Sequence, residues 1–284
     1  MTVAVVTDST AHLPEGFAER YGIGVVPLHV LVDGVSSLDG VEFGPAALAG
    51  ALEQRKIVTT SRPTPAAFAA AFREALDGGA DAVVSVHLSK KLSGTWEAAV
   101  LAAQEVGPDR VRVVDSRTVA MGLGFAALEA AETARRGAGV EEVEAAAVAA
   151  AEASETFFVV ETLEYLRRGG RIGHAAALLG TALAVKPVLH MAEGEIRPLE
   201  KVRTMQRALN RLVDLVAEAA GDDAVSIAVH HLASPDRAAQ LATRIDERVP
   251  GSTGCVVSEL GAGVGAHTGP GVVGVVVRRG VRTR

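Results

Sequence analysis

Short apolar runs alternate with amphipathic, alanine-rich segments through the first half of the chain. The runs consist mostly of valine and other apolar residues, as in strands that are largely buried, and lie at 3–6, 25–32, 35–38, 80–86 and 111–114. Helical spacing, often introduced by a proline or a hydroxyl residue, occurs at 14–20, 45–54, 65–77, 94–106, 120–135 and 140–153. Strands that alternate with helices predict a mostly parallel sheet flanked by helices, with ligands at the carboxyl ends of its strands.

The pattern changes near Ser154, where the alanine-rich helices end. The turn signal Glu193-Gly194 lies between two extended runs and predicts a hairpin. The elements expected in this half are strands at 157–160, 184–190, 195–200, 226–229, 254–257 and 272–277 and helices at 204–220 and 235–248. We therefore expect two α/β domains: residues 1–154 with the parallel sheet, and residues 155–284 with a mixed sheet.

Composition and charge narrow the class of protein. With 284 residues, of which 49% are hydrophobic and 22% charged, the chain is long enough to form two hydrophobic cores. A net charge of −6 provides no broad basic surface for nucleic acid. The single cysteine, Cys255, excludes an internal disulfide and a cysteine-ligated metal cluster. Residues 2–7 predict a strand rather than a signal peptide, and there is no 18-residue apolar span, so we expect a cytoplasmic protein.

The stretch 87–97 joins a short apolar strand to an alanine-rich helix, and Ser93 lies where that helix is expected to begin. Serine at such a position commonly caps the helix. Alternatively, the hydroxyls of Ser93 and Thr95, the free N–H groups and the helix dipole can converge on a carboxylate or phosphate. The residues of this stretch support both interpretations.

A second hydroxyl-rich loop is expected at 59–65. Thr64 predicts a cap for the helix that begins at Pro65, and the other hydroxyls are typical of turns. Thr60 and Ser61 can also hydrogen-bond the same acid group as Ser93.

Three further features lie in predicted loops or at the ends of predicted elements. Asp8 is expected to fix the end of the first strand by hydrogen bonds. Gly169-Gly170 predicts a helix end and a turn, because the surrounding residues match no nucleotide-binding pattern, and Arg171 is free to pair with a nearby acid. His267 lies in the glycine-rich stretch 261–271, where a loop can hold its imidazole against another site or leave it in solvent.

Taken together, separated motifs along essentially the whole chain resemble the DegV family of bacterial fatty-acid-binding proteins. They are Thr7-Asp8-Ser9-Thr10, Thr60-Ser61-Arg62-Pro63-Thr64-Pro65, Leu88-Ser89 with Leu92-Ser93-Gly94-Thr95, Val114-Asp115-Ser116, Leu163 to Ile172, Lys186-Pro187, Lys201 to Thr204, and His267 to Gly271. The set is specific, although no single motif is. The loop expected at 59–65 departs from the family pattern at Arg62, where a neutral residue is more usual.

The resemblance implies two α/β domains with a long-chain fatty acid between them, its tail in a buried apolar tunnel and its carboxylate near the surface. By that analogy the carboxylate is bound by Ser93, Thr60, Ser61 and His267. A head-group network, or a surface that docks a kinase, is implied for Arg171, Arg203, Gly94 and Thr268.

The resemblance also implies that the chain is not itself an enzyme. It would present the acid to a dihydroxyacetone-kinase-like fatty acid kinase, which forms acyl phosphate for phospholipid metabolism and supplies ATP and Mg²⁺. No cofactor or metal of its own is expected, and lipid exchange implies brief contact with a membrane surface.

Two alternatives stay open. A serine esterase would use Ser93, His267 and an acid such as Asp115 or Asp8, although Leu92-Ser93-Gly94 is not the G-x-S-x-G elbow of such enzymes. A carrier for another anionic lipid or a polyketide would need the same apolar slot and the same polar donors.

Overall fold

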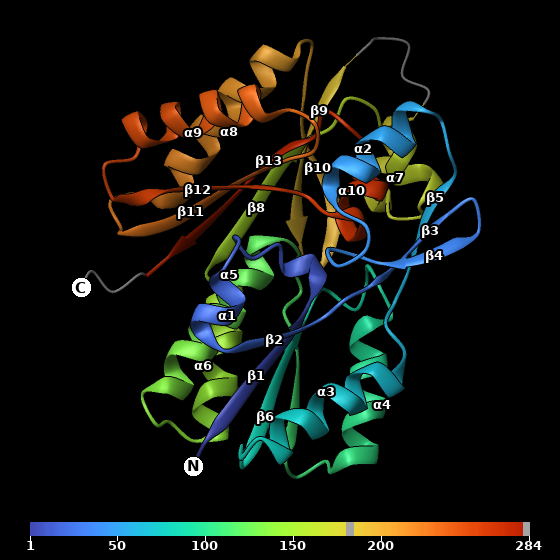
Figure 1. Cartoon of the computed structure of the whole chain (residues 1–284). Coiled ribbons are helices and arrows are strands. Elements are labelled where there is room, and N and C mark those ends of the chain that lie inside the picture. Colours follow the sequence, from blue (N-terminus) through green and yellow to red (C-terminus); the bar gives the residue numbers. More distant parts are fainter. Residues whose placement is uncertain (180–184, 281–284) are drawn as a thin grey trace. The chain divides into compact units, whose positions relative to one another are not determined.

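The structure is a computed structural model that describes residues 1–179 and 185–280, and its internal contacts divide the chain into two units (Figure 1). Unit 1 comprises Met1–His29 and Ser61–Glu152, and unit 2 comprises Val30–Thr60 and Ala153–Arg284. The domain boundary expected at residues 154/155 lies close to the last point at which the chain passes from unit 1 to unit 2, between Glu152 and Ala153. Residues 30–60, which the sequence placed in the N-terminal domain, belong to unit 2 because they form their own small sheet and pack against a helix near the C-terminus.

Unit 1 is built on a parallel sheet of strand order β2-β1-β6-β7. Its strands are β1 (Val3–Asp8), β2 (Ile23–Val26), β6 (Ala82–His87) and β7 (Val111–Asp115). Helices α3 (Pro65–Asp77) and α4 (Thr95–Val106) cover one face, and α5 (Met121–Arg135) and α6 (Val140–Glu152) cover the other. The short elements η1 (Ser9–Ala11) and α1 (Phe17–Tyr21) follow β1. The prediction of a parallel sheet flanked by helices is confirmed.

Strand alternation in unit 1 divides its apolar residues between two cores. Val83 packs with Phe68 and Phe72 of α3, whereas Val84 packs with Leu123 of α5. Successive side chains point to opposite faces of a strand, so a run of valines with no polar position requires cover on both sides. This explains why the strands of unit 1 lack the polar alternation of a half-exposed sheet.

The single strand expected at 25–32 is wrong. The chain instead forms β2, which ends at Val26, and β3 (His29–Val32), which belongs to a different sheet. Pro27 lies between them and has no N–H to donate to a strand ladder, so the pairing ends there. The prediction of a helix beginning at Pro65 is confirmed, and Thr64 caps it by accepting a hydrogen bond from the N–H of Ala67.

Unit 2 contains a mixed sheet of order β10-β9-β8-β13-β11-β12, in which β11 and β12 are parallel and the other neighbours antiparallel. Its strands are β8 (Ser154–Val159), β9 (Lys186–Ala192), β10 (Glu195–Val202), β11 (Val225–His231), β12 (Ser252–Glu259) and β13 (Val273–Arg279). Helices α8 (Met205–Ala220) and α9 (Pro235–Arg248) lie side by side over one face. The mixed sheet and the hairpin at Glu193-Gly194 are confirmed, while the expected strand start at Ala184 lies outside the described residues.

A smaller group of elements completes unit 2. They are β3, β4 (Val35–Leu38) and β5 (Val58–Ser61) in a three-stranded sheet, with α2 (Pro45–Glu53), α7 (Glu164–Arg168), η2 (Gly173–Leu178) and α10 (Ala262–Thr268). Two predicted loops are wrong here, because residues 59–61 lie in β5 and most of the glycine-rich stretch forms α10. Gly265 permits that helix to pack closely on α2, since a Cβ atom at 265 would lie 2.6 Å from Leu48 Cδ2.

A buried polar network closes the carboxyl end of the sheet in unit 1. The carboxylate of Asp8 accepts hydrogen bonds from the N–H and hydroxyl of Thr10, and from the N–H of Leu88 at 3.2 Å. His87 Nδ1 lies 2.9 Å from Asp8 Oδ2, and His87 Nε2 lies 2.6 Å from Ser85 Oγ. The side chains of Asp8 and His87 have no exposed surface. The prediction that Asp8 fixes the strand end is confirmed.

Replacing Asp8 by alanine is expected to lower the free energy of unfolding by about 3 kcal/mol, because it leaves several buried donors without an acceptor. Urea denaturation measures this loss. Asp81→Ala is the matched control at the other end of the sheet, where the exposed carboxylate accepts a hydrogen bond from Thr2 N. Its expected loss in the free energy of unfolding is about 1 kcal/mol or less. Equal losses in the two variants would contradict a central role for the Asp8 network.

Candidate functional site

The loop after β6 carries Ser93 and is held between the ends of two neighbouring strands. The N–H of Ser89 donates to Thr118 O at 2.9 Å, and the N–H of Lys90 donates to Asp115 Oδ1 at 3.3 Å. The N–H of Ser93 in turn donates to Ser89 O at 3.2 Å. The fold therefore presents Ser93 at the carboxyl end of the parallel sheet, where open α/β sheets bind ligands.

Ser93 does not cap the helix that follows it. Helix α4 begins at Thr95 with Gly94 as its N-cap, and among the described residues no side chain satisfies that cap. The Ser93 and Thr95 hydroxyl oxygens lie 2.9 Å apart. In such a pair one hydroxyl donates to the other, which leaves the second proton for another acceptor. The hydroxyl pair thus lies at a positive helix end with a donor to offer.

Arg62 packs against Gly94. Its guanidinium donates to Gly94 O at 3.4 Å, and a Cβ atom at position 94 would overlap that guanidinium. No acidic side chain within the described residues forms an ion pair with Arg62. Ser61 is exposed, and its hydroxyl makes a long contact of 3.5 Å with Arg62 O. Gly94 therefore provides space that lets a positive charge lie beside the hydroxyl pair.

In unit 2, His267 lies near the end of α10 and is hydrogen-bonded to Thr60. The distance from His267 Nε2 to Thr60 Oγ1 is 2.7 Å. Burial lowers the pKa of His267 to about 4, with a further contribution from the positive charge of Arg171. The imidazole is accordingly neutral at pH 7. It can exchange hydrogen bonds with a ligand but provides no counter-charge.

Gly169 is a site residue that the sequence did not reveal. It ends α7, and its φ of −72° is open to any residue, whereas Gly170 has the positive φ of +69° that the turn requires. A Cβ atom at 169 would overlap His267 Nδ1, so the first glycine provides room for the imidazole. The carbonyl of Gly169 also accepts a 2.5 Å hydrogen bond from Arg171. The sequence signal for this role was the pair of glycines, because a single glycine is enough to end a helix.

The other predicted residues have different surroundings. Thr268 is buried and donates to Val264 O at 3.3 Å, so its hydroxyl serves α10 itself. Arg203 is exposed before α8 and forms no ion pair within residues 1–179 and 185–280. Unit 2 thus brings together Thr60, His267 and Arg171. Unit 1 holds the remaining predicted donors, Ser61 and Ser93.

The acids considered for an esterase have other partners. Asp8 contacts His87, and Asp115 accepts hydrogen bonds from the N–H groups of Lys90 and Arg117. Ser85, His87 and Asp8 do form a hydroxyl–imidazole–carboxylate series, but none of the three is exposed. A substrate carbonyl has no access to Ser85 Oγ, so this series stabilises the fold rather than providing a nucleophile.

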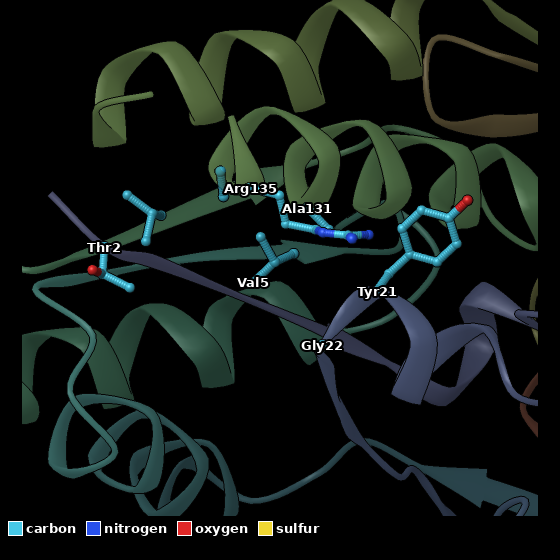
Figure 2. A pocket seen from close by; sticks show the side chains of 8 residues that line it. Thr2, Val5, Tyr21, Gly22, Ala131 and Arg135 are labelled. Atoms are coloured by element: carbon cyan, nitrogen blue, oxygen red, sulfur yellow. The ribbon is translucent and has the colours of Figure 1, made fainter. Parts of the chain in front are cut away.

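A small cavity of about 210 Å³ lies near the amino end of β1, whereas the candidate site residues of unit 1 lie at the carboxyl end of the sheet (Figure 2). Thr2, Val5, Tyr21, Gly22, Ala131 and Arg135 are among its lining residues, and the guanidinium of Arg135 lies 5.9 Å from the centre of the Tyr21 ring. Ligand pockets for small molecules usually measure about 300–1,000 Å³. The cavity is therefore too small for a long-chain lipid, and it shares no residue with the candidate site.

Two classes of feature are absent from the described part of the chain. No group of three or more His, Cys, Asp or Glu side chains is arranged to hold a metal ion there. None of the helices at 1–179 and 185–280 combines the length and hydrophobicity needed to cross a membrane.

His267 is expected to titrate with a midpoint of about pH 4, which histidine-selective NMR can measure. Because its folded pKa lies below the ordinary value of 6.5, the unfolded chain binds the proton more readily between those limits. Stability should therefore fall as the pH falls from 6.5 to 4, and His267→Asn should reduce that dependence. A midpoint near 6.5 would show that the imidazole is not buried in solution.

Gly169→Ala is expected to displace the imidazole of His267 and to raise its pKa toward the ordinary value, because the added Cβ overlaps the ring. The same NMR titration measures this change. Gly50→Ala is the matched control, since it lies in α2 with open space around the added Cβ. An unchanged His267 midpoint in Gly169→Ala would contradict the packing described here.

Comparison with known proteins identifies the family. The family described as "Uncharacterised protein, DegV family" matches residues 2–279. A DegV domain-containing protein of Streptomyces coelicolor is 55% identical over 275 residues, which cover 97% of this chain and 98% of the relative. A fatty-acid-binding DegV family protein from Thermus thermophilus has 37% identity and a TM-score of 0.93, and covers 98% of this chain and 100% of its own. DegV of Bacillus subtilis, described as a fatty acid binding protein, has 32% identity, a TM-score of 0.90 and coverage of 99% and 100%. The chain therefore belongs to the DegV family.

Proposed function

We propose that this protein binds a long-chain fatty acid. The observation that carries the ligand class is its likeness, over nearly the full length of both chains, to the two fatty-acid-binding proteins from Thermus thermophilus and Bacillus subtilis. A buried acyl chain contributes about 0.8 kcal/mol per CH₂ group, so a long chain has ample driving force for binding. Only 4% of the residues are aromatic, and an interior of alanine, valine and leucine suits the lining of an apolar slot.

Thr60, Ser61, Ser93 and His267 bind the carboxylate in this proposal. Support comes from the 2.7 Å contact of Thr60 with His267 and from the hydroxyl proton left over in the Ser93–Thr95 pair. These donors are neutral and hold a carboxylate with moderate strength. A bidentate arginine would occupy both oxygens, whereas single hydroxyl and imidazole donors leave lone pairs for reaction.

The bound acid is then presented to a fatty acid kinase subunit. One carboxylate oxygen attacks the γ-phosphorus of ATP, the bond to the β-phosphate oxygen breaks, and acyl phosphate and ADP form. The sequence offers no phosphate-binding loop, so the partner holds ATP and Mg²⁺ and this chain is not itself an enzyme. Exposed Arg203, with Arg171, is assigned to docking or to the head-group network. The product enters phospholipid metabolism, and lipid exchange involves brief contact with a membrane surface.

Native mass spectrometry of the purified protein, followed by solvent extraction, identifies the ligand. The expected result is one long-chain fatty acid per chain. A different anionic lipid would favour the alternative carrier function. An empty protein that also fails to take up added palmitate would overturn fatty acid binding.

Ser93→Ala and His267→Ala are each expected to weaken palmitate binding about tenfold through loss of a donor to a charged group, and to lower acyl phosphate formation with the kinase. Isothermal titration and a coupled kinase assay measure the two effects. Ser252→Ala and His174→Ala are matched controls, because both side chains lie outside the proposed head-group site. Normal binding and turnover in both site variants would remove the head-group assignment, while normal binding without any acyl phosphate would reject the kinase step.

A further inference from the structure

Helix α10 is contacted at its start, its middle and its end by residues of the segment 30–60 of unit 2. Asp39 lies at the amino end of the helix, Leu48 packs against its middle, and Thr60 contacts His267 near its carboxyl end. Helix α10 has seven residues, too few to be stable by itself in water. Its position, and with it that of His267, depends on these contacts.

The contact at Asp39 is the one best suited to fix the helix. Its side chain is buried, with 2% of the residue exposed. Asp39 Oδ1 accepts a hydrogen bond of 2.8 Å from Ala262 N, and Oδ2 accepts one of 3.2 Å from Gly263 N. The N-cap residue, Gly261, has no side chain that could accept a hydrogen bond from the first turn of the helix. The carboxylate of Asp39, 223 positions before Ala262 in the sequence, provides this acceptor instead. Its charge also complements the positive helix end.

The contact at Leu48 holds the middle of α10 close to α2. A Cβ atom at Gly265 would lie 2.6 Å from Leu48 Cδ2 and 3.1 Å from Leu232 Cδ2, so the helix backbone already lies as close to these side chains as it can. With the helix fixed at its first turn and at its middle, the imidazole two residues further on meets Thr60 at hydrogen-bond distance.

We propose that Asp39 is a positioning residue that acts through α10 to hold the imidazole of His267 against Thr60. In this proposal Asp39 acts on the position of His267 and not by contact with the ligand. The functional consequence rests on the proposed binding of a fatty acid carboxylate by His267, but the positioning itself can be measured without any ligand.

The test compares Asp39→Ala and the milder Asp39→Asn with Glu42→Gln. Glu42 lies in the same loop, is exposed, and accepts a hydrogen bond from Leu38 N, so it is a matched loss of a carboxylate. Histidine-selective NMR gives the titration midpoint of His267, and isothermal titration gives the affinity for palmitate. Thermal denaturation reports folding, and Asp39→Asn carries the test if Asp39→Ala does not fold.

The two effects of removing Asp39 have opposite signs. Loss of a negative charge alone would lower the pKa of His267, whereas release of α10 exposes the imidazole to water and raises the pKa. We expect the midpoint to rise by about one pH unit or more in Asp39→Ala, less in Asp39→Asn and not in Glu42→Gln. Palmitate affinity should fall about five- to tenfold in Asp39→Ala.

Each outcome decides between the alternatives. An unchanged or lowered midpoint in folded Asp39 variants overturns the positioning role, whatever happens to the melting temperature. A raised midpoint with weaker palmitate binding supports it. A raised midpoint with unchanged affinity also supports the positioning of His267, and it rejects instead the proposed role of His267 in binding the carboxylate.

Discussion

Desolvation of the His267 imidazole is the constraint on which the candidate site of unit 2 depends. Burial disfavours the protonated form of the imidazole and, with a smaller contribution from the positive charge of Arg171, lowers its pKa to about 4. The ring is kept in place by three features from distant parts of the sequence: the hydroxyl of Thr60, the missing side chain of Gly169 and the packing of α10 on α2. Neutral hydrogen bonding, rather than charge, is the chemistry that this histidine can offer at pH 7.

Both units use aspartate carboxylates to hold the backbone that carries their polar donors. Asp8 accepts from the N–H of Leu88 and Asp115 from the N–H of Lys90, which fixes the loop before Ser93. Asp39 accepts from two N–H groups at the start of α10. A carboxylate suits this task because each oxygen can bind a separate N–H group. The donors of the site therefore stay on fixed backbone although they lie on loops and strand or helix ends.

Local patterns in the sequence were sufficient for most of the fold and for part of the site. Apolar runs without polar alternation identified the parallel sheet, and Thr64-Pro65 identified a helix start, because both depend on neighbouring residues. The assignment of residues 30–60 to unit 2, the role of Gly169 and the contact of Asp39 with α10 could not be predicted. Each depends on a partner far away in the sequence, up to 223 positions for Asp39 and Ala262. Pro27 was a local sign that the strand ends there, but the apolar residues on both sides of it favoured one continuous strand.

Each unit has an arginine close to one of the proposed carboxylate donors. Arg62 lies against Gly94 without an acidic partner in the described part of the chain, and Arg171 lies near His267. The positive charge of an arginine attracts an anion over several ångströms, whereas neutral hydroxyl and imidazole groups act only at hydrogen-bond distance. This division of roles suits the proposed carrier function, because a direct arginine pair would bind the oxygens that take part in the proposed phosphoryl transfer.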